Sequence, residues 1–350
     1  MIVFRKIRLA IHKILHWEYW PFQVVYIPVY FLWLYYAVKA KSLFFFNAAN
    51  PSITNGGFMM ESKKEIYDLI PPQFYPKTEL IKEGIAATAV QKVAIDAGIK
   101  YPFIAKPDIG LRGSGVKKIE NSTDLETYAA KANFDYVIQN LIPYTNEVGI
   151  FYVRYPNQKA GKITGIVSKE FLIVEGDGVL TVEQLVRLNP RFEMQLPSLE
   201  REYGSMLNTV LAQGQKLNLV PYGNHARGAK FIDGSHWITP KLEAMMNTIC
   251  LQIDGFYFGR LDIMYDSFAD LEQGKNFSIV ELNGAGSEPT HIYDPKHSLF
   301  FAWKELMRHI TYMYEISVIN HKNGVAYLQH KDGIREYKLH IQQSSKITNI

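Results

Sequence analysis

The sequence predicts an α+β fold. Short apolar segments with the alternating pattern of strands are mixed along the chain with segments whose apolar residues recur at helical spacing. Such a mixture is typical of domains in which sheets and helices pack on one another. The chain has 350 residues, of which 47% are hydrophobic. That is enough to bury a substantial core and to form about two or three domain-sized units.

The charge and cysteine content exclude several classes of protein. The net charge is only +4, from 38 Lys and Arg against 34 Asp and Glu, which predicts at most a local basic surface and no nucleic-acid partner. The single cysteine, Cys250, permits no internal disulfide and no cysteine metal cluster, which fits a reducing compartment. Because it lies in an apolar helical stretch, we interpret Cys250 as a core residue.

Residues 1–16 predict a basic amphipathic helix. They contain Arg5, Lys6, Arg8 and Lys13 and no acidic residue, and their apolar residues recur at helical spacing. Helices of this kind bind anionic membrane surfaces.

Residues 17–46 are rich in aromatic side chains and form a candidate membrane segment. The uncharged stretch 20–38 would be about 28 Å long as a helix, close to the thickness of a bilayer core. Pro21 and Pro28 interrupt this stretch, and Trp and Tyr favour the headgroup region. We therefore expect an interfacial or re-entrant anchor. A true membrane span, and aromatic packing against the protein itself or a second subunit, are the alternatives.

The rest of the chain begins with a connector and continues with mixed elements. Residues 47–75 are rich in turn formers, and a short helical pattern from Ser62 ends at Pro71 and Pro72. Further helices are expected at residues 86–97, 181–187 and 240–252. Strands are expected at residues 103–106, 136–139, 149–154, 258–264 and 277–282.

A glycine-rich segment follows the first of these strands. Lys106 ends the strand, and Gly110, Gly113 and Gly115 follow within residues 105–116. Glycine permits positive φ angles and a close approach of the backbone to phosphate oxygens. The segment lacks the Gly-Lys-Ser/Thr ending of a Walker loop and the helix of a dinucleotide fingerprint. It predicts a phosphate-binding loop, with an ordinary glycine-rich hairpin as the alternative.

A polar break separates the next two strands. Residues 139–146 interrupt two apolar segments, and their backbone groups could pair with the edge of an adenine base. Glu147 could accept hydrogen bonds from ribose hydroxyls. The alternative is a simple loop with a solvated glutamate.

Charged and amide side chains lie on two apolar strands near the end of the mixed region. In a strand, residues two apart point to the same face. Arg260 and Asp262 therefore share one face, and Glu281 and Asn283 share a face of the next strand. If the two strands are neighbours, two carboxylates and an amide oxygen meet beside one guanidinium. These hard oxygen ligands suit Mg²⁺. Surface strands with alternating charges are the alternative, but buried carboxylates without a cation would be costly.

Taken in order, these motifs resemble the ATP-grasp superfamily, and within it the D-alanine:D-alanine ligase-like and carboxylate-amine ligase branches. The resemblance covers about residues 76–315. It implies an ATP-grasp fold, in which two α+β subdomains clasp ATP. The expected parts are an aromatic helical segment 1–46, a connector 47–75, a first subdomain with the glycine-rich lid 76–147, a second subdomain with the metal site 148–315, and a C-terminal tail 316–350.

The resemblance implies how the nucleotide would be bound. Lys106 and Lys169 would hold phosphates, the hinge 139–142 would read adenine, and Glu147 would hold the ribose. The candidate nucleotide-binding residues are Lys106, Gly110, Gly113, Ser114, Gly115, Gln139, Asn140, Leu141, Ile142, Glu147, Lys169 and Asn224.

The resemblance also implies the metal and catalytic residues. Asp262, Glu281 and Asn283 would bind two Mg²⁺ ions, with Mn²⁺ as a substitute, and Arg260 would stabilise the transferring phosphoryl group. Residues 174–185 are similar to a Gly-Asp-Gly turn and helix of related ligases. Residues 223–231 stand where those enzymes have a loop near the γ-phosphate. In this segment Asn224, Arg227 and His225 are candidates for contact with the substrate. His225 would act as a general base or would merely be solvated.

The implied activity is that of an ADP-forming ligase that uses ATP and Mg²⁺ to activate a carboxylate as an acyl phosphate and to join it to an amine. A phosphotransferase on the same fold and a non-catalytic nucleotide-binding protein at the membrane are the alternatives. D-Alanine ligases have a folded N-terminal domain where residues 1–75 here are aromatic and anchor-like, so D-alanine is not the expected substrate. Because ATP is cytoplasmic, the expected location is the cytoplasmic face of a membrane, or the cytoplasm, with an oligomer left open.

Overall fold

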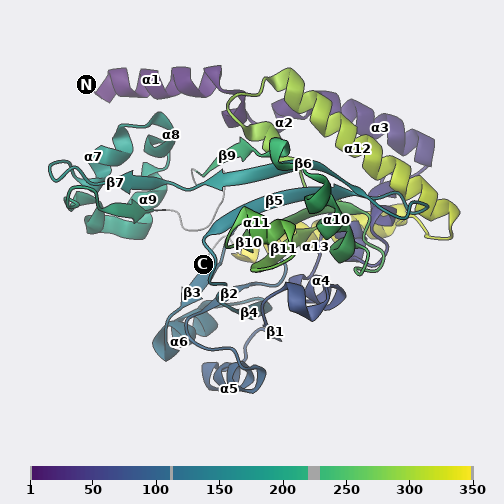
Figure 1. Ribbon diagram of the computed structural model, residues 1–350, viewed down its shortest axis with the longest axis horizontal. Helices are drawn as coiled ribbons and strands as arrows, with labels where there is room; N and C mark the ends of the chain where they lie inside the picture. The colour runs from purple at the N-terminus through teal and green to yellow at the C-terminus, as the bar shows by residue number, and fades with distance from the viewer. Residues whose placement is uncertain (1, 111–112, 220–228, 348–350) are drawn as a thin grey trace. The chain divides into compact units, whose positions relative to one another are not determined.

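The computed structural model describes residues 2–110, 113–219 and 229–347 (Figure 1). It combines helices with antiparallel sheets, which confirms the α+β prediction. The chain forms two compact units, each built from separate stretches of sequence. Unit 1 consists of Met1–Val29, Val167–Gly234 and Thr290–Glu305, and unit 2 of Tyr30–Ile166, Ser235–Pro289 and Leu306–Ile350.

The elements that lie mainly in unit 2 are α3 Ile27–Ala40, α4 Lys63–Leu69, β1 Thr78–Ile81, α5 Ala87–Ala97, β2 Phe103–Pro107, β3 Lys117–Ile119, α6 Ser122–Lys131, β4 Tyr136–Asn140, β5 Asn146–Val153, α10 Pro240–Cys250, β10 Phe258–Tyr265, α11 Phe268–Glu272, β11 Phe277–Asn283, α12 Leu299–Lys322 and α13 His330–Ile347. Those of unit 1 are α1 Ile2–Leu15, α2 Phe22–Val25, β7 Ile173–Glu175, α7 Val182–Arg187, α8 Pro190–Glu193, α9 Leu196–Tyr203, β8 Lys216–Asn218 and β9 Lys230–Asp233. Strand β6, Lys162–Glu170, runs from unit 2 into unit 1.

The smaller sheet of unit 2 has the strand order β1-β4-β2-β3, with every pair antiparallel. Its inward side chains, including Phe103 and Ile138, pack on Val90 of α5 and Leu125 of α6. Helix α5 stops at Gly98, which adopts the left-handed conformation that ends many helices (φ 69°). The sheet therefore carries its helices through the apolar faces that the sequence pattern predicted.

The larger sheet of unit 2 has the order β11-β10-β5-β6, and β6 continues into unit 1, where it pairs with β9. Helix α10 covers a core that includes Cys250, which is fully buried. The side chain of Thr239 caps α10 by accepting a hydrogen bond from the Leu242 amide, and Pro240 occupies the first turn. The core position predicted for Cys250 is confirmed.

The C-terminal part of the chain differs from the sequence prediction. The predicted boundary at residue 315 falls inside α12, and the predicted tail forms the end of α12 and the whole of α13. Gly333 of α13 packs against the ring of Phe44, and Ile347 joins the core of the smaller sheet. The sequence analysis expected no element here, because few apolar residues mark α13 and those that anchor it contact segments far away in the sequence.

The aromatic N-terminal segment is divided by its prolines. Pro21 precedes α2, and Pro28 lies in the first turn of α3. One side of α3 packs in unit 2, where the ring of Tyr36 stacks on Tyr314 and its hydroxyl contacts Thr311. The opposite side of α3 is exposed. Within the part of the chain that the structure describes, no helix combines the length and the apolar character needed to cross a membrane.

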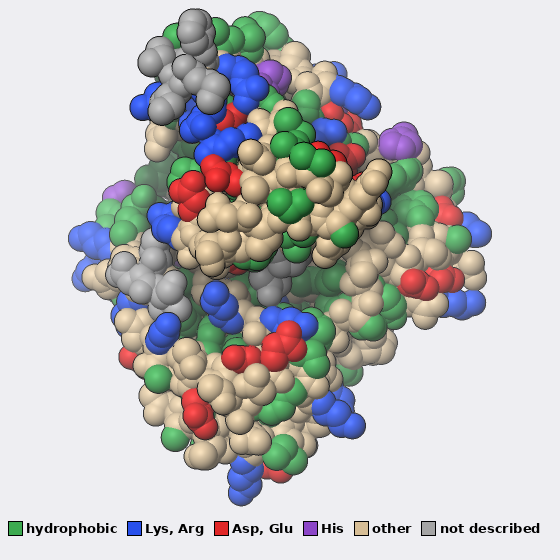
Figure 2. All heavy atoms as spheres, turned by 90° about the vertical axis from the view of Figure 1, so that its left-hand side faces the viewer, with side chains coloured by type: hydrophobic (Ala, Val, Ile, Leu, Met, Phe, Trp, Pro, Cys, Tyr) green, Lys and Arg blue, Asp and Glu red, His purple; other side chains and the backbone are tan. Residues whose placement is uncertain are grey.

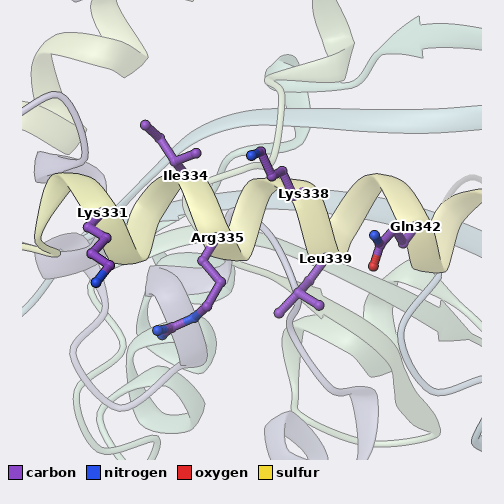
Figure 3. Close-up of a pocket in the computed structure, with 6 residues that line it drawn as sticks. All are labelled: Lys331, Ile334, Arg335, Lys338, Leu339 and Gln342. Atoms are coloured by element: carbon purple, nitrogen blue, oxygen red, sulfur yellow. The ribbon is translucent and has the colours of Figure 1, made fainter.

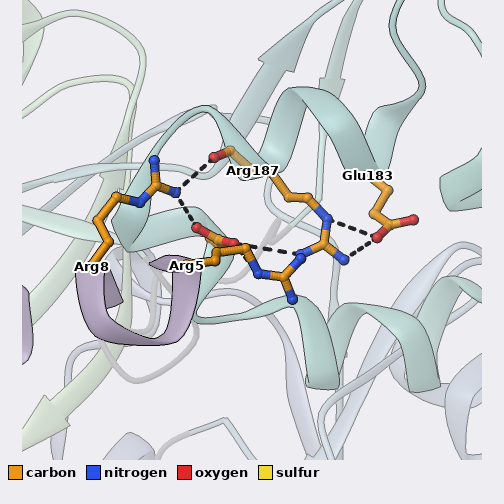
Figure 4. Close-up of polar contacts among 5 residues, drawn as sticks. Arg5, Arg8, Glu183 and Arg187 are labelled. Atoms are coloured by element: carbon orange, nitrogen blue, oxygen red, sulfur yellow. Dashed lines mark hydrogen bonds and ion pairs between the residues drawn. The ribbon is translucent and has the colours of Figure 1, made fainter. Parts of the chain in front are cut away.

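Ion pairs and hydrogen bonds hold helix α1 to the 167–234 part of unit 1 (Figure 4). Glu193 is fully buried, and its carboxylate contacts the guanidinium groups of Arg5, Arg8 and Arg187. The Nε atom of Arg5 lies 3.0 Å from Oε1 of Glu193. A buried carboxylate requires such partners, so two cations of the predicted basic helix are engaged by the protein itself. On the face that Figure 2 shows, basic and acidic side chains are interspersed, as the small net charge implies.

Candidate functional site

The two strands that carry the predicted metal residues are antiparallel neighbours. In the register of β10 and β11, Asp262 lies opposite Glu281, and Arg260 lies opposite Asn283. The pairing shifts just after Asp262, which marks a bulge of the kind that re-aims side chains beside functional sites. The four side chains predicted from the sequence therefore meet on one pair of strands.

Arg260 forms a buried, bidentate ion pair with Asp262. Its Nε donates to Oδ1 of Asp262 at 2.8 Å, and its Nη2 donates to Oδ2 at 3.0 Å. Its Nη1 donates to the carbonyl oxygen of Glu288 at 3.2 Å. Burial by itself lowers the pKa of Arg260, but the Asp262 carboxylate outweighs this and raises it. In this arrangement Arg260 orients Asp262 and holds the loop after β11.

The other two predicted magnesium ligands, Glu281 and Asn283, lie on the strand that pairs with that of Asp262. Oε1 of Glu281 lies 4.0 Å from Nζ of Lys63, and Nδ2 of Asn283 is buried without a hydrogen-bond partner in the described structure. Rotation of the Asn283 side-chain amide by a half turn would put its oxygen at the position of Nδ2. The described residues contain no cluster of three or more His, Cys, Asp or Glu suited to a metal. A magnesium ion would therefore take further ligands from water and phosphate, as it usually does.

Lys106 is buried beside the same strand. Its Nζ donates to the hydroxyl of Tyr67 at 2.9 Å, to Oε1 of Gln139 at 3.0 Å and to the carbonyl oxygen of Val280 at 3.3 Å. Burial lowers the pKa of Lys106 to about 8, although the charge of Glu281 opposes this. The predicted phosphate-binding lysine thus lies next to the strand of Glu281, without an adjacent ion-pair partner among these contacts.

The sequence predicts Gln139 both as the end of a strand and as the first hinge residue. It lies inside β4, paired with Ile104 on one side and Thr78 on the other. Its side chain bridges Lys106 and the Thr78 hydroxyl, to which Nε2 donates at 2.6 Å. Because its backbone belongs to the sheet, its contribution is to hold Lys106. Asn140 ends β4, and only Leu141 and Ile142 lie in the link beyond the strand.

The glycine-rich segment links β2 and β3, which pair as a hairpin. Gly113 and Gly115 have φ angles of 73° and 70°, which favour glycine. The Gly110 carbonyl accepts a hydrogen bond from Lys63 Nζ at 3.3 Å. Ser114 lies in the same link, and part of the segment, residues 111–112, lies outside the described residues. The geometry agrees with both a phosphate loop and a plain hairpin.

The remaining candidates are placed separately. Glu147 lies at the start of β5, opposite Met264 of β10. Lys169 belongs to unit 1, where its Nζ lies 6.0 Å from the centroid of the Phe231 ring. Asn224, His225 and Arg227 lie outside the described residues. Their roles, like that of Lys169, stay predictions.

Sequence reasoning missed several residues of this site because it treated residues 47–75 as a connector. Lys63 lies between the Gly110 carbonyl and Glu281, and Tyr67 contacts both Lys106 and the Val280 carbonyl. Ser62 caps α4 by accepting a hydrogen bond from the Glu65 amide. The Ser-x-x-Glu pattern marked that helix start, but nothing local indicated that its buried tyrosine would contact a strand more than two hundred residues away.

A hollow on the surface of α13 lies apart from these residues. It has a volume of about 330 Å³ and is lined by α13 alone (Figure 3). Its residues are Lys331, Ile334, Arg335, Lys338, Leu339 and Gln342. None of them is a predicted site residue, and a hollow on one exposed helix face does not enclose a ligand.

Comparison with known proteins gives structural matches only. No family model and no curated sequence matches the chain. A bifunctional glutathione synthetase from Pasteurella multocida is 14% identical with a TM-score of 0.39, over 73% of this chain and 38% of that one. VanG D-Ala:D-Ser ligase from Enterococcus faecalis is 13% identical with a TM-score of 0.41, over 72% and 61%. D-Alanine–D-alanine ligase from Bacillus anthracis is 12% identical with a TM-score of 0.42, over 75% and 69%.

These solved structures are ATP-grasp enzymes, the superfamily that the sequence motifs resemble. The chain spans well under two thirds of the synthetase and slightly under two thirds of the VanG ligase. At these identities and TM-scores the matches carry no argument about activity.

Proposed function

We propose that this protein is an ATP- and Mg²⁺-dependent ligase that activates a carboxylate as an acyl phosphate and condenses it with an amine. The observation that supports the proposal most is the approach of Lys106 to β11. Its Nζ lies 3.3 Å from the carbonyl oxygen of Val280, the residue before Glu281. The predicted phosphate-binding lysine and a predicted magnesium ligand are thus close together, which supports the proposal because binding of Mg–ATP requires a cation and metal ligands side by side.

In this proposal the chain positions the triphosphate and offsets its charge. Lys106 exchanges one of its present partners for a phosphate oxygen, and the amides of the glycine-rich segment cover the phosphates. Leu141 and Ile142 offer backbone groups to adenine, and Glu147 receives the ribose hydroxyls. The phosphate and substrate roles predicted for Lys169, Asn224, His225 and Arg227 stay predictions from the sequence.

The magnesium site would be formed by Asp262, Glu281 and Asn283. Bound Mg²⁺ would polarise the phosphoryl oxygens and offset their charge. Arg260 keeps the Asp262 carboxylate in one orientation through its two hydrogen bonds. Any N–H of Arg260 that turns towards the phosphoryl group would stabilise the charge that develops during transfer.

A carboxylate is a poor acyl donor, and conversion to an acyl phosphate gives it a good leaving group. The chain must then keep water away while the amine attacks, which favours aminolysis over hydrolysis. A phosphotransferase would use the same triphosphate site and would need no amine. A non-catalytic protein would bind the nucleotide without turning it over.

An ADP-release assay of the full-length protein against pools of acids and amines tests the proposal. The ligase should release ADP only when acid, amine and Mg²⁺ are all present, and mass analysis should find the acid joined to the amine. ADP with a stable phosphorylated acid would identify a phosphotransferase. Nucleotide binding without ADP under any combination would identify a non-catalytic protein.

We also propose that the exposed face of α3 contacts an anionic membrane surface. Tyr30, Phe31, Leu34, Tyr35 and Val38 recur at helical spacing on this face. Phe31 is 70% exposed and Val38 is 78% exposed, which is unusual for large apolar residues on one helix. Lys39 and Lys41 follow at the end of the helix, so apolar contact and charge attraction act together.

Flotation with vesicles tests this second proposal. The full-length protein should float with vesicles that contain phosphatidylserine, and high salt should weaken the binding only in part because the aromatic contact persists. Phe31→Ser with Leu34→Ser should abolish flotation. If the double variant floats as the wild type does, α3 is not the contact surface.

A further inference from the structure

Residues 54–61 pack against the loop that follows Asn283, one of the proposed magnesium ligands. The amide of Ala285 donates to the carbonyl of Gly56 at 2.9 Å, and the amide of Gly286 donates to the carbonyl of Gly57 at 2.8 Å. A Cβ on Gly57 would lie 2.7 Å from the Cα of Gly284. This glycine-on-glycine contact fastens the segment to the loop that follows Asn283.

The segment is held in an unusual backbone conformation from its other side by α13. Asn55 and Met60 have positive φ angles of 49° and 57°, which are uncommon outside glycine. The Met60 amide donates to Nδ1 of His340 at 3.3 Å, and the amide group of Asn55 contacts Glu336 at 3.5 Å. The position of the next residue, Glu61, is therefore determined by contacts on two sides.

Glu61 presents a buried carboxylate oxygen that nothing in the described structure satisfies. Its Oε2 has no solvent exposure and no hydrogen-bond partner among the described residues. Burial raises the pKa of Glu61, its own backbone amide and Lys63 lower it, and Glu281 raises it. Lys63, two residues further along the chain, has its Nζ 4.0 Å from Oε1 of Glu281, so Glu61 lies near the proposed magnesium site.

We propose that Glu61 binds the ammonium group of the acceptor amine and places it beside the reacting carboxylate. This inference rests on the proposed ligase function. A buried carboxylate oxygen without a hydrogen-bond partner is costly and is stabilised by a cation. Lys63 is already bound to the carbonyl oxygens of Asp108 and Gly110.

Position and chemistry agree with an acceptor site. The amine must attack where the acyl phosphate forms, next to Glu281, and Glu61 lies on the segment that packs against the loop after β11. A primary amine bears a positive charge at neutral pH, so it binds to Glu61 as an ammonium ion. Before the attack it passes one proton to a phosphate oxygen of the acyl phosphate. Its nitrogen then bonds to the acyl carbon, the bond from that carbon to the phosphate oxygen breaks, and the phosphate leaves with the second proton. The acceptor is therefore expected to be a primary amine rather than a hydroxyl compound.

The test compares Glu61→Gln with the wild-type full-length protein by thermal shift. The nucleotide is Mg²⁺ with the non-hydrolysable analogue AMP-PNP, and the probes are ethanolamine, glycinamide and glucosamine at constant ionic strength. Their N-acetyl derivatives are the uncharged controls. Asp68→Asn is the matched control variant, because Asp68 is an exposed acid on α4 whose carboxylate pairs with Lys64.

In the wild type and in Asp68→Asn, at least one amine should raise the melting temperature beyond AMP-PNP alone, while N-acetyl derivatives should not. Glu61→Gln should lose this increment, with amine affinity weakened roughly tenfold to a hundredfold, and should keep the shift caused by Mg–AMP-PNP. An equal amine shift in Glu61→Gln, or no amine shift in the wild type, overturns the inference. Absence of the Mg–AMP-PNP shift itself overturns the proposed function instead, so the two failures differ.

A kinetic readout separates amine binding from a structural role. Once the ADP-release assay has identified a substrate pair, Glu61→Gln should raise the KM for the amine and leave hydroxylamine, which is largely uncharged at neutral pH, as good an acceptor as in the wild type. Equal losses with both acceptors would show that Glu61 only supports the fold of the site.

Discussion

Replacement of Lys106 by methionine should reveal the energetic cost of the buried ammonium. Methionine is unbranched and of similar length, so it fills the space between β2 and β11 without the charge. The variant should lose binding of Mg–ATP, because the phosphates lose their cation. Its folded state should nevertheless remain about as stable as the wild type at neutral pH.

The magnitude follows from the pKa of Lys106. Burial lowers this pKa from 10.5 to about 8, which corresponds to roughly 3 kcal/mol between the charged and neutral forms. Removal of the charge relieves that cost at pH 7. The variant, however, leaves the Oε1 of Gln139 without its donor, at a cost of about 1–3 kcal/mol. The two effects nearly cancel, so a net change within about 2 kcal/mol is expected.

The lowered pKa of Lys106 also predicts how the stability difference between the two proteins changes with pH. Above pH 8 the folded wild type loses the Lys106 proton, whereas the unfolded chain keeps it until about pH 10.5. The unfolded state then binds more protons, so the wild type should become more stable relative to the variant by roughly 3 kcal/mol across this window. Other groups titrate in both proteins and cancel in the difference.

Urea unfolding of both proteins at several pH values between 7 and 10.5 measures this difference. If the free energies of unfolding of wild type and Lys106→Met run parallel with pH, Lys106 is not a buried charge and the reasoning is refuted. In the same range the affinity of the wild type for Mg–ATP should fall by up to about tenfold per pH unit above pH 8, since only the protonated lysine attracts phosphate. Lys106→Arg should bind without this dependence.

Three further variants test the other contacts. Glu281→Gln should abolish Mg²⁺-dependent ADP release with little change in melting temperature, because its side chain is 37% exposed; wild-type turnover would remove it from the metal site. Arg260→Ala should lower the melting temperature strongly as well as the rate, because Asp262 would stay buried without its partner, at about 3–5 kcal/mol; a rate effect with unchanged unfolding would contradict the ion pair. Glu193→Gln should free α1 and speed tryptic cleavage after Arg5 and Arg8, whereas exposed Glu200→Gln should not; equal digestion of both would mean that other contacts hold α1.

The sequence by itself determined the elements whose signals are local. Thr239 and Pro240 marked the start of α10, and the prolines at 21 and 28 marked the breaks between the N-terminal helices. The alternation along β10 placed Arg260 and Asp262 on one face because successive strand residues point to opposite sides. Caps, turns and periodicity depend on neighbours a few residues apart, so they can be read without the fold.

The tertiary structure alone decided how those elements meet. Lys106 reaches the Val280 carbonyl across 174 residues of sequence, and Gly57 contacts Gly284 across a longer separation still. The same packing places α13 within the C-terminal region 316–350 and the side chain of Gln139 between Lys106 and Thr78. It also left Glu61 as a buried carboxylate without a partner for one of its oxygens. These juxtapositions depend on which apolar faces pack together, and no spacing within either segment encodes the distance to the other.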